Sequence, residues 1–574
     1  MKRRFKLTGA SIAALVATVV IAMVVSPLSS GAARAPRALS KMTLSRMSSA
    51  AQFAYRLAHG QAPQARLLAR AGATYRSSGP ARSVAPEAAA ATFSRHRFNL
   101  DTTGLTQNEE SVAACRANNK EVLMGQNDLA GFFLTPSPNS LTGTDFSTDG
   151  GSTVKKYAFG PPVSLAGTTV ASVGDPAMAI SKNCATLVGA SLAFDLSGVT
   201  DKSGIEVFRS TTTTMSGSCT GFACWPTKRA VGYNNNDPSV FEDHEALDVG
   251  VSGAAGEVIW VTWTHFFGPA PGTSRIVGVR CNLALTSCTA PITISDPADS
   301  PLSGAAFTQF SDVKVAQDGQ VYVTWVVVKI GLNGTQQFVE KIKRAGPGST
   351  AFGASSVVHS FAAGGAAGEA VPFGGVLPGL NHDRVATFPR LEVMRVGTSN
   401  KLFSVYEACQ ATAFFGVSCQ NPRVFLVAST TNGASWSAPV AISTAGVDAF
   451  FPDAAADWAV GGKLYVTWYG MDPDLTGAPI TDFRHRYALM GRSVNPSTLA
   501  LGTTSRLSPP TESNADALGV ALGLLTIIGD YQTAFAQGGL LYDGFTAAYF
   551  KQKALGAGLP VHGQDNWLAV VTGL

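Results

Sequence analysis

The segment FEDHEALDVG, residues 241–250, gathers side chains that could carry out proton transfer. Four acids surround one histidine within seven residues: Glu242, Asp243, His244, Glu245 and Asp248. A carboxylate pair beside a histidine can act as general acid and base, or can bind a metal ion. We therefore take Asp243 and Glu245 as candidate catalytic residues and His244 as a candidate substrate-binding residue. The competing interpretation is a solvated loop that leads into a strand.

Asp243 also belongs to a column that recurs along the chain. A short motif that ends in a charged residue occurs as QNE, VGD, FED, FSD, FPR, FPD and IGD. The column residues are Glu109, Asp175, Asp243, Asp312, Arg390, Asp453 and Asp530. If the repeats are equivalent, these side chains surround one axis, where carboxylates could bind sugar hydroxyls or a hard cation such as Ca²⁺. We take Asp175, Asp312 and Asp453 as candidate ligands for Ca²⁺, and no other cofactor is indicated. The alternative is that each carboxylate bonds backbone amides of a neighbouring repeat.

Two further segments add candidates for a sugar site. In GDYQTAF, residues 529–535, Asp530 is a third catalytic candidate, because close carboxylates raise one another's pKa and can form an acid/base pair. Tyr531 beside it could stack on a sugar, as could Trp458 in DWAVGG, although both could equally be core aromatics. Arg390 is the remaining candidate for substrate binding.

A repeated strand must position these residues. VTW ends the segments at 257–263, 320–325 and 461–468, and related strands end at Tyr406 and Phe545. The five strand ends are 62, 81, 62 and 77 residues apart. With two earlier copies, the pattern predicts seven units of several short strands each, which is typical of β-propeller blades.

The expected fold is therefore all-β, a seven-bladed β-propeller, with six blades as the alternative. The VTW side chains should fill the space between blades, because a single four-stranded blade cannot bury both of its faces. We expect the last strand-like segment, NWLAVVTGL at 566–574, to close the ring by joining an N-terminal blade.

Two turn motifs sharpen this expectation. STDGGSTV (147–154) and STTNGASW (429–436) share the frame S-x-D-x-G-x-x-aromatic, with Val154 and Thr431 as departures from it. The frame is a hairpin turn in which the serine and the acid accept hydrogen bonds from turn amides and glycine takes a positive φ. These motifs resemble the Asp-box, or bacterial neuraminidase repeat, of sialidase-like β-propellers. The resemblance covers roughly residues 100–574 and implies the fold more than the function.

The resemblance does not carry the sialidase catalytic residues with it. That set would include an early Arg-Ile-Pro segment, three arginines that clamp a carboxylate, a Tyr–Glu pair and an acidic Asp. No Arg-Ile-Pro occurs, and FPRL at 388–391 is explained as a copy of the column. We therefore expect a protein that acts on or binds extracellular glycans without being a true sialidase. A non-catalytic propeller that binds a protein or a cell-wall partner is the alternative. If the protein is an enzyme, we expect a glycoside hydrolase-like activity.

The N-terminal region indicates export. MKRRFK, an apolar run at 12–25 and small residues up to Ala33 are typical of a secretory signal peptide, which we place at 1–33. An Ala/Arg-rich leader or linker at 34–99 and a propeller at 100–574 follow. Residues 1–100 hold 15 Lys and Arg against one acid, so the remaining 28 basic and 37 acidic residues give 101–574 a charge of −9. We expect a secreted or envelope-associated monomer without nucleic-acid partners or an integral membrane segment in the mature chain.

The eight cysteines agree with an oxidising compartment. Sequence alone does not determine how they pair, but three close pairs suggest local staples: Cys219–Cys224, Cys281–Cys288 and Cys409–Cys419. Cys115 and Cys184 are left for each other. A metal site formed by the cysteines is disfavoured, because no CxxC pair or nearby histidine cluster accompanies them.

Overall fold

The computed structural model describes most of the chain from residue 92 onward. The gaps are 102–104, 106, 198–199, 238, 268–272, 304, 332–335, 362–367, 371–375, 378–382, 410, 414–417, 446, 460, 472–485, 513–527, 550, 554–559 and 563. The expected signal peptide, and the expected leader as far as residue 91, lie outside the described residues. No helix among the described residues is long and apolar enough to cross a membrane.

Seven antiparallel sheets form the body of the fold, and we number them as blades in chain order. Blade 1 contains β2 (Gln107–Ala114), β3 (Val122–Asp128), β4 (Thr142–Ser147) and β5 (Lys156–Phe159). Blade 2 contains β8 (Ala177–Ile180), β9 (Thr186–Phe194), β10 (Ser203–Thr211) and β11 (Thr227–Tyr233), extended by β6 (Val163–Leu165) and β7 (Thr168–Ser172). Blade 3 contains β12 (Phe241–Val251), β13 (Glu257–Phe267), β14 (Thr273–Asn282) and β15 (Ile292–Thr293). Blade 4 contains β16 (Ala306–Val315), β17 (Val321–Ile330), β18 (Gln336–Ala345) and β19 (Ser356–Ser360).

The remaining three blades complete the set. Blade 5 contains β22 (Arg390–Val396), β23 (Ser399–Ala408), β26 (Arg423–Ser429) and β27 (Val440–Ala441). Blade 6 contains β28 (Ala449–Ala456), β29 (Leu464–Met471), β30 (Arg486–Val494) and β31 (Ser505–Arg506), with β32 (Thr511–Glu512) beside β30. Blade 7 contains β33 (Thr533–Gln537), β34 (Leu540–Ala547), β37 (Asp565–Thr572) and β1 (Thr92–Arg97).

Short elements connect or flank the blades. Two small sheets are formed by β20 (Val376–Leu377), β21 (Asp383–Arg384), β24 (Ala411–Ala413) and β25 (Ser418–Gln420), and by β35 (Lys551–Lys553) and β36 (Pro560–His562). The helical turns are α5 (Leu129–Leu134), α6 (Thr212–Ser216), η1 (Gly221–Cys224), η2 (Gly253–Ala255) and η3 (Pro297–Asp299).

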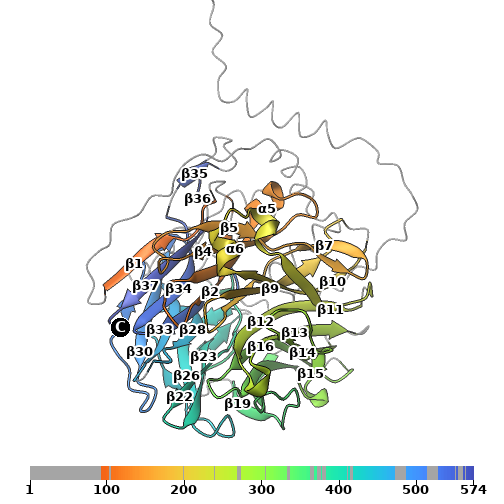
Figure 1. Cartoon of the computed structure of the whole chain (residues 1–574). Helices are drawn as coiled ribbons and strands as arrows, with labels where there is room; N and C mark the ends of the chain where they lie inside the picture. The colour runs from red at the N-terminus through yellow and green to blue at the C-terminus, as the bar shows by residue number, and fades with distance from the viewer. Residues whose placement is uncertain are drawn as a thin grey trace, which may run out of the picture. The chain divides into compact units, whose positions relative to one another are not determined.

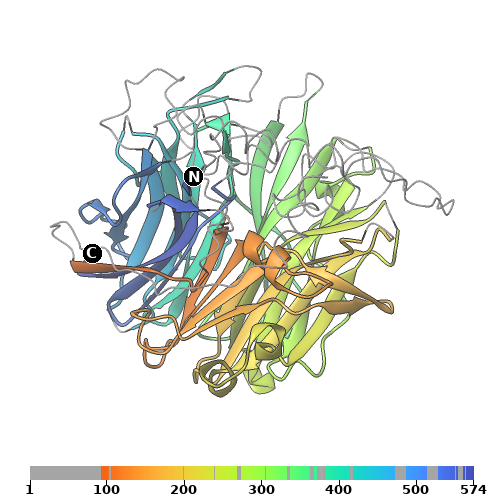
Figure 2. The same cartoon turned by 90° about the horizontal axis from the view of Figure 1, so that it is seen from above.

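The first strands of the blades form a closed circle. Each of β2, β8, β12, β16, β22, β28 and β33 contacts the next, and β33 contacts β2. The sheets fan out from this circle, as the colour sequence shows (Figures 1 and 2). The predicted seven-bladed β-propeller is confirmed, and the six-bladed alternative is wrong.

The ring closes differently from our expectation. The C-terminal strand β37 stays in blade 7, between β34 and β1, and the N-terminal strand β1 joins that blade as its outermost strand. The two strands lie side by side in Figures 1 and 2. Arg97 also forms an ion pair of 2.8 Å with Asp565. The propeller therefore includes residues 92–97, which precede the expected boundary at residue 100.

The VTW strands are the second strands of their blades. Trp263, Trp325 and Trp468 are at most 2% exposed, and each lies in a cluster built from adjacent blades. Their predicted role, to fill the space between sheets, is confirmed. A large aromatic side chain buries more apolar area than an aliphatic one, and this compensates for the short strands.

The two turn motifs have the hydrogen bonds that their letters predict. Ser147 Oγ accepts from the amides of Asp149 and Gly151, and Asp149 Oδ1 accepts from the Thr153 amide at 2.9 Å. In the second turn, Thr431 Oγ1 replaces the acid and accepts from the Ser435 amide at 2.8 Å. Both turns join the third and fourth strands of a blade and lie away from the central circle.

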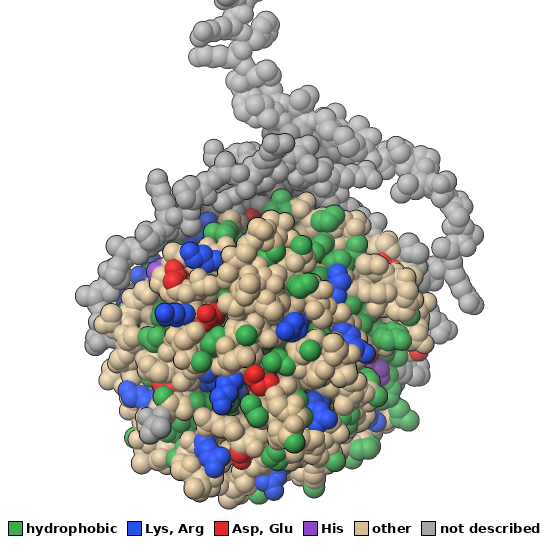
Figure 3. Space-filling view, in the orientation of Figure 1, with side chains coloured by type: hydrophobic (Ala, Val, Ile, Leu, Met, Phe, Trp, Pro, Cys, Tyr) green, Lys and Arg blue, Asp and Glu red, His purple; other side chains and the backbone are tan. Residues whose placement is uncertain are grey.

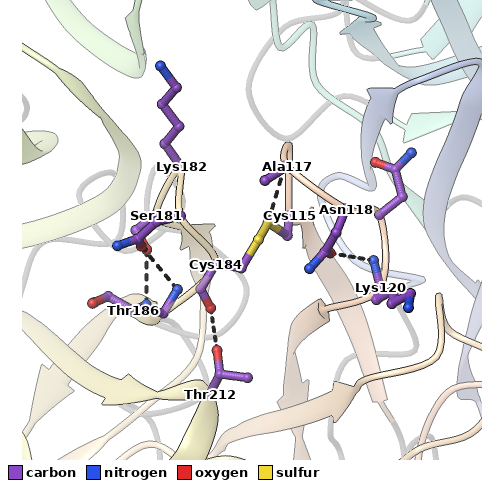
Figure 4. The surroundings of a disulfide bond; sticks show 12 residues. Cys115, Ala117, Asn118, Lys120, Ser181, Lys182, Cys184, Thr186 and Thr212 are labelled. Carbon is purple, nitrogen blue, oxygen red and sulfur yellow. Dashed lines mark hydrogen bonds between the residues drawn. A yellow bond between two sulfur atoms is a disulfide. The ribbon is translucent and has the colours of Figure 1, made fainter.

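All four expected disulfides are present. Three close short loops, whereas Cys115–Cys184 joins the end of β2 to the β8–β9 turn and so ties blade 1 to blade 2 (Figure 4). The Cys184 carbonyl accepts from Thr212 Oγ1, and the Ala117 amide lies 3.3 Å from Cys115 Sγ. The face seen in Figure 3 carries scattered rather than gathered charges.

Candidate functional site

The start of each inner strand is shaped by a β-bulge. The strand pairing shifts between Asn108 and Ser111, Asp243 and Ala246, Gln309 and Asp312, and Phe450 and Asp453. The first bulged residue has a positive φ in four blades: Glu109, His244, Phe310 and Phe451. A bulge of this kind re-aims a side chain and is common beside functional sites.

The bulge defines an equivalent position in all seven blades. It lies two residues before the inner-strand residue that pairs with the threonine of VTW, or with its counterpart. We call the residues at this position the axial ring: Glu109, Asp175, His244, Phe310, Phe388, Phe451 and Tyr531. Asp175 also has a positive φ of 54°.

Aromatic members of the axial ring meet at its centre. The His244 ring centroid lies 5.5 Å from that of Phe310, 4.5 Å from that of Phe388 and 5.9 Å from that of Tyr531. Phe388 also contacts Phe310, at 4.2 Å. These residues come from four blades, so their convergence is a consequence of the closed ring.

The two acidic members of the axial ring form a carboxyl pair. Burial raises the pKa of Asp175 well above its usual range, and Glu109 beside it raises the pKa further. A protonated Asp175 can then donate a hydrogen bond to an ionised Glu109. Glu109 is held in place, since it accepts from Asn127 Nδ2 at 2.5 Å and from the Asp530 amide at 3.0 Å. One neutral acid next to one carboxylate is the arrangement that general acid–base catalysis requires.

A cavity of about 110 Å³ runs along the axis below the ring. It is lined by charged side chains, among them Asp248, Lys314, Glu392 and Asp453. Burial opposes the charge on Lys314, but Asp312 and the three acids just named outweigh it and raise its pKa. Burial raises the pKa of Glu392 to about 7. At roughly 10–15 Å³ for each water, the cavity has room for several waters.

The column predicted from the sequence is not one structural ring. Asp312, Asp453 and Arg390 follow the bulge position, Asp243 and Asp530 precede it, and Glu109 and Asp175 occupy it. The three-letter repeat was aligned on a phenylalanine that sits at a different register in FED than in FSD and FPD. A shift of this kind changes the height and the facing of a strand side chain.

Several acids near the axis bracket neighbouring blades. Asp312 Oδ2 accepts from the Leu391 amide at 2.9 Å, Asp453 Oδ2 from the Ala534 amide at 2.7 Å, and Asp248 Oδ2 from the Val315 amide at 2.7 Å. Each bond crosses from one inner strand to the next. These contacts are the structural alternative that the sequence left open.

The structure does not gather the three residues expected to bind Ca²⁺. Asp175 lies beside Glu109, whereas Asp312 and Asp453 lie near Lys314 and Arg390. In the described part of the chain, the group of potential ligand atoms close enough to hold a metal is Cys115, Glu121 and Cys184, and both cysteines are in a disulfide.

The other predicted site residues are brought only partly together. Tyr531, Arg390 and His244 meet at the axis, where Arg390 Cζ lies 5.3 Å from the Tyr531 ring centroid and Arg390 Nε lies 3.6 Å from Asp453 Oδ1. Asp243 Oδ2 accepts from Gln309 Nε2 at 3.2 Å. Glu245 lines the cavity, and burial raises its pKa well above its usual range.

Trp458 lies at the other end of the cavity. It follows β28, and Arg116 Cζ lies 3.6 Å from its ring centroid. Its Nε1 donates to the Val393 carbonyl at 2.9 Å. Trp458 therefore closes the end at which the inner strands finish, away from the axial ring.

Sequence reasoning missed two pairs at the end where the inner strands begin. Glu109 and Asp175 were both in the column, yet nothing in the letters indicated that they would touch. Glu242 lies 2.9 Å from His265 Nδ1 and accepts from Trp263 Nε1 at 2.6 Å. The His265 side chain is 31% exposed. It is 23 residues from Glu242 and reaches it only through the β12–β13 pairing.

Comparison with known proteins adds a likeness of fold. No family model and no curated protein matches the chain. A solved structure of Hadza microbial sialidase Hz136 is similar, with 12% identity, coverage of 75% of this chain and 73% of that chain, and a TM-score of 0.39. Phage phi92 endosialidase has 10% identity, coverage of 84% and 69%, and a TM-score of 0.42. Penicillium chrysogenum alpha-L-arabinanase has 12% identity, coverage of 57% and 92%, and a TM-score of 0.32.

The sialidase-like character expected from the turn motifs therefore reappears among solved propellers. At this level of identity and TM-score, the likeness carries no argument about activity.

Proposed function

We propose that this protein is a secreted propeller that acts on or binds extracellular glycans at the end of its channel where the inner strands begin. The observation that carries the proposal is the Glu109–Asp175 carboxyl pair at the axis. Its two members come from adjacent blades, and burial keeps one of them protonated. Glycoside hydrolysis commonly uses two carboxyl groups, one as an acid and one as a base or nucleophile.

The contacts of the pair suggest a role for each residue. Asp175 would protonate the leaving oxygen of a glycosidic bond. Glu109, oriented by Asn127 and by the Asp530 amide, would act as the base or the nucleophile. Tyr531, whose pKa burial raises well above its usual range, stays neutral and would offer its ring to a sugar.

The proposal does not extend to sialic acid. A sialidase would clamp a carboxylate with three arginines. Among the described residues that line the axial cavity, Arg390 is the arginine that contacts the axial ring, and its guanidinium pairs with Asp453. The described site therefore lacks the clamp.

A non-catalytic scaffold is the second candidate, and the burial of the same residues favours it. Glu109 is 0% exposed, Asp175 1%, His244 3% and Tyr531 7%. The bracket bonds from Asp312, Asp453 and Asp248 give neighbouring acids a structural role. In this case a protein or wall polymer would bind the loops, and the axis would only hold the blades together.

The two candidates differ in one measurement. The purified full-length protein would be tested for turnover of chromogenic glycosides, including sialosides, and of native polysaccharides. Asp175→Asn and Glu109→Gln would be compared with Asp149→Asn, which alters a turn far from the axis. We expect each axial variant to lower kcat by about 10²–10⁴-fold, as for loss of an acid/base group, and the control to leave kcat unchanged.

The outcomes separate the candidates. Turnover that falls in both axial variants, with unchanged melting temperatures, supports the enzyme. Saturable glycan binding without turnover supports the binding form of the proposal. Neither turnover nor binding on any glycan would contradict the proposal and leave the scaffold as the leading candidate.

A further inference from the structure

A second pocket lies outside the axis, on the side of blade 6 that packs against blade 5. It has a volume of about 270 Å³. Its lining includes Val447, Trp468, Met471, Met490, Arg506 and Pro510. Trp468 shares a hydrophobic cluster with Val405 and Leu426 of blade 5, which places the pocket at the junction of the two blades.

The strand pairing of blade 6 places three of these residues in one row. Trp468 on β29 pairs with Met490 on β30, and Met490 pairs with Arg506 on β31. Residues that pair directly in antiparallel strands point to the same face of the sheet. The row therefore combines an indole, a thioether and a guanidinium on one wall.

Blade 4 has the same row with a different outcome. Trp325 on β17 pairs with Lys341 on β18, and Lys341 pairs with Val357 on β19. Trp325 Nε1 donates to Asp299 Oδ2 at 3.1 Å, and Asp299 also pairs with Lys341. Asp299 belongs to η3, in the connection from blade 3. A carboxylate of the chain itself thus occupies the place opposite the indole.

Blade 3 repeats this chemistry with another carboxylate. Trp263 Nε1 donates to Glu242 Oε2 at 2.6 Å. In blade 6, the corresponding connection contributes Ser443, Thr444 and Val447, and no carboxylate among the described residues accepts from the Trp468 indole. The cation of the row has moved from the second position, Lys341, to the third, Arg506.

We propose that this pocket binds a carboxylate carried on an apolar body, such as an aryl or alkyl carboxylate. The carboxylate would take the place that Asp299 and Glu242 occupy in the other blades, and would accept from Trp468 Nε1 and pair with Arg506. Met471, Met490, Val447 and Pro510 would enclose the apolar body. The site is separate from the axial ring and does not depend on the glycan proposal.

The size and lining of the pocket agree with such a ligand. A dry cavity of roughly 150 Å³ already accepts benzene. A water needs two to four polar partners, so a mostly apolar wall favours an apolar occupant over a water cluster. The exposed Arg506 at the margin would attract an anion and neutralise it.

The test is ligand binding by the purified full-length protein, followed by fluorine NMR line broadening. The probe is para-fluorophenylpropionate. The corresponding alcohol tests the need for a carboxylate, and acetate tests the need for the apolar body. Arg506→Gln removes the cation and Trp468→Phe removes the N–H donor while keeping an aromatic ring. Arg395→Gln removes an exposed arginine on β22 and is the matched control.

We expect saturable binding of the propionate, weaker by about tenfold in Arg506→Gln and in Trp468→Phe, and unchanged in Arg395→Gln. The alcohol and acetate should bind more weakly than the propionate. Equal binding of propionate and alcohol, or an unchanged dissociation constant in Arg506→Gln, would overturn the proposal, as would the absence of saturable binding. If Trp468→Phe fails to fold, the two arginine variants still decide.

Discussion

At the scale of single residues, buried carboxyl groups determine how the stability of this propeller depends on pH. Glu206 on β10 is 0% exposed, and burial raises its pKa from 4.5 to about 8. The unfolded chain releases this proton near pH 4.5, whereas the folded chain keeps it up to about pH 8. The contribution of Glu206 to stability is therefore complete below pH 4.5 and falls as the pH rises to 8.

We predict that Glu206→Gln stabilises the protein at high pH. The amide cannot ionise, so the variant avoids the cost of keeping a proton that the unfolded chain would release. The free energy of unfolding should exceed that of the wild type by about 2–5 kcal/mol at pH 8 and match it closely at pH 4.5. Urea unfolding across this range measures the difference. A gap that does not change with pH would contradict the assigned cause.

Lys314 is the residue on which the charge balance of the axial cavity depends. It faces Asp248, Asp312, Glu392 and Asp453, and Lys314→Met would leave these acids without their shared cation. We predict a loss of about 3–5 kcal/mol in the free energy of unfolding. The loss should be larger at pH 8 than at pH 5.5, because the raised pKa values of Glu392, Asp453 and Asp248 let them become neutral as the pH falls. Lys314→Arg keeps the charge and is the control, with urea unfolding as the measurement.

At the scale of elements, inner strands are tied to one another by carboxylates that cross from blade to blade. Asp457 follows β28 of blade 6, and its two oxygens accept from the amides of Gly538 and Gly539 in the β33–β34 turn of blade 7, at 2.9 and 2.7 Å. Both glycines have positive φ, of 62° and 79°. The carboxylate thereby fixes a turn that only glycine adopts easily.

Removing this bracket should loosen blade 7. Asp457→Ala leaves two amides without their acceptor, and we predict a loss of about 3 kcal/mol in the free energy of unfolding. Asp457→Asn keeps one carbonyl oxygen and should lose about half as much. Asp237→Ala, at an exposed residue that bonds only within its own turn, is the control. Hydrogen exchange at the β33–β34 turn should rise in the alanine variant; unchanged exchange there would show that the bond is dispensable.

At the scale of the whole molecule, the ring is held together by contacts between segments far apart in sequence. β1 and β37 pair across more than 450 residues, and Cys115–Cys184 links blades 1 and 2 across 69 residues. Cys219–Cys224 spans only 5 residues. A longer closed loop restricts the unfolded chain more and therefore stabilises the folded one more.

We predict that the two disulfides differ in what their removal costs. The pair of substitutions Cys115→Ser and Cys184→Ser should lower the free energy of unfolding by about 4 kcal/mol, and Cys219→Ser with Cys224→Ser by about 2 kcal/mol. Thermal unfolding of the two double variants and the wild type measures this order. A larger loss for the short loop would mean that native packing, rather than loop closure, decides the contribution.

The sequence by itself determined the features that depend on local pattern. Alternating strands with Trp263, Trp325 and Trp468 at similar spacing predicted seven blades, because each repeat is one unit that must pack against the next. Cysteines a few residues apart predicted local disulfides. The serine, acid and glycine of the 147–154 segment predicted a hairpin turn, since their hydrogen bonds form within the segment itself.

Only the tertiary structure decided which side chains meet at the axis. The bulge in each inner strand moves Asp243 and Asp312 to different heights, and no letter in FED or FSD marks where the extra residue is inserted. The Glu109–Asp175 pair forms because two neighbouring blades converge, and Glu242 meets His265 because two strands pair. The physical reason is that strand side chains alternate between faces, so a shift of one residue sends a carboxylate to the axis or to the next blade.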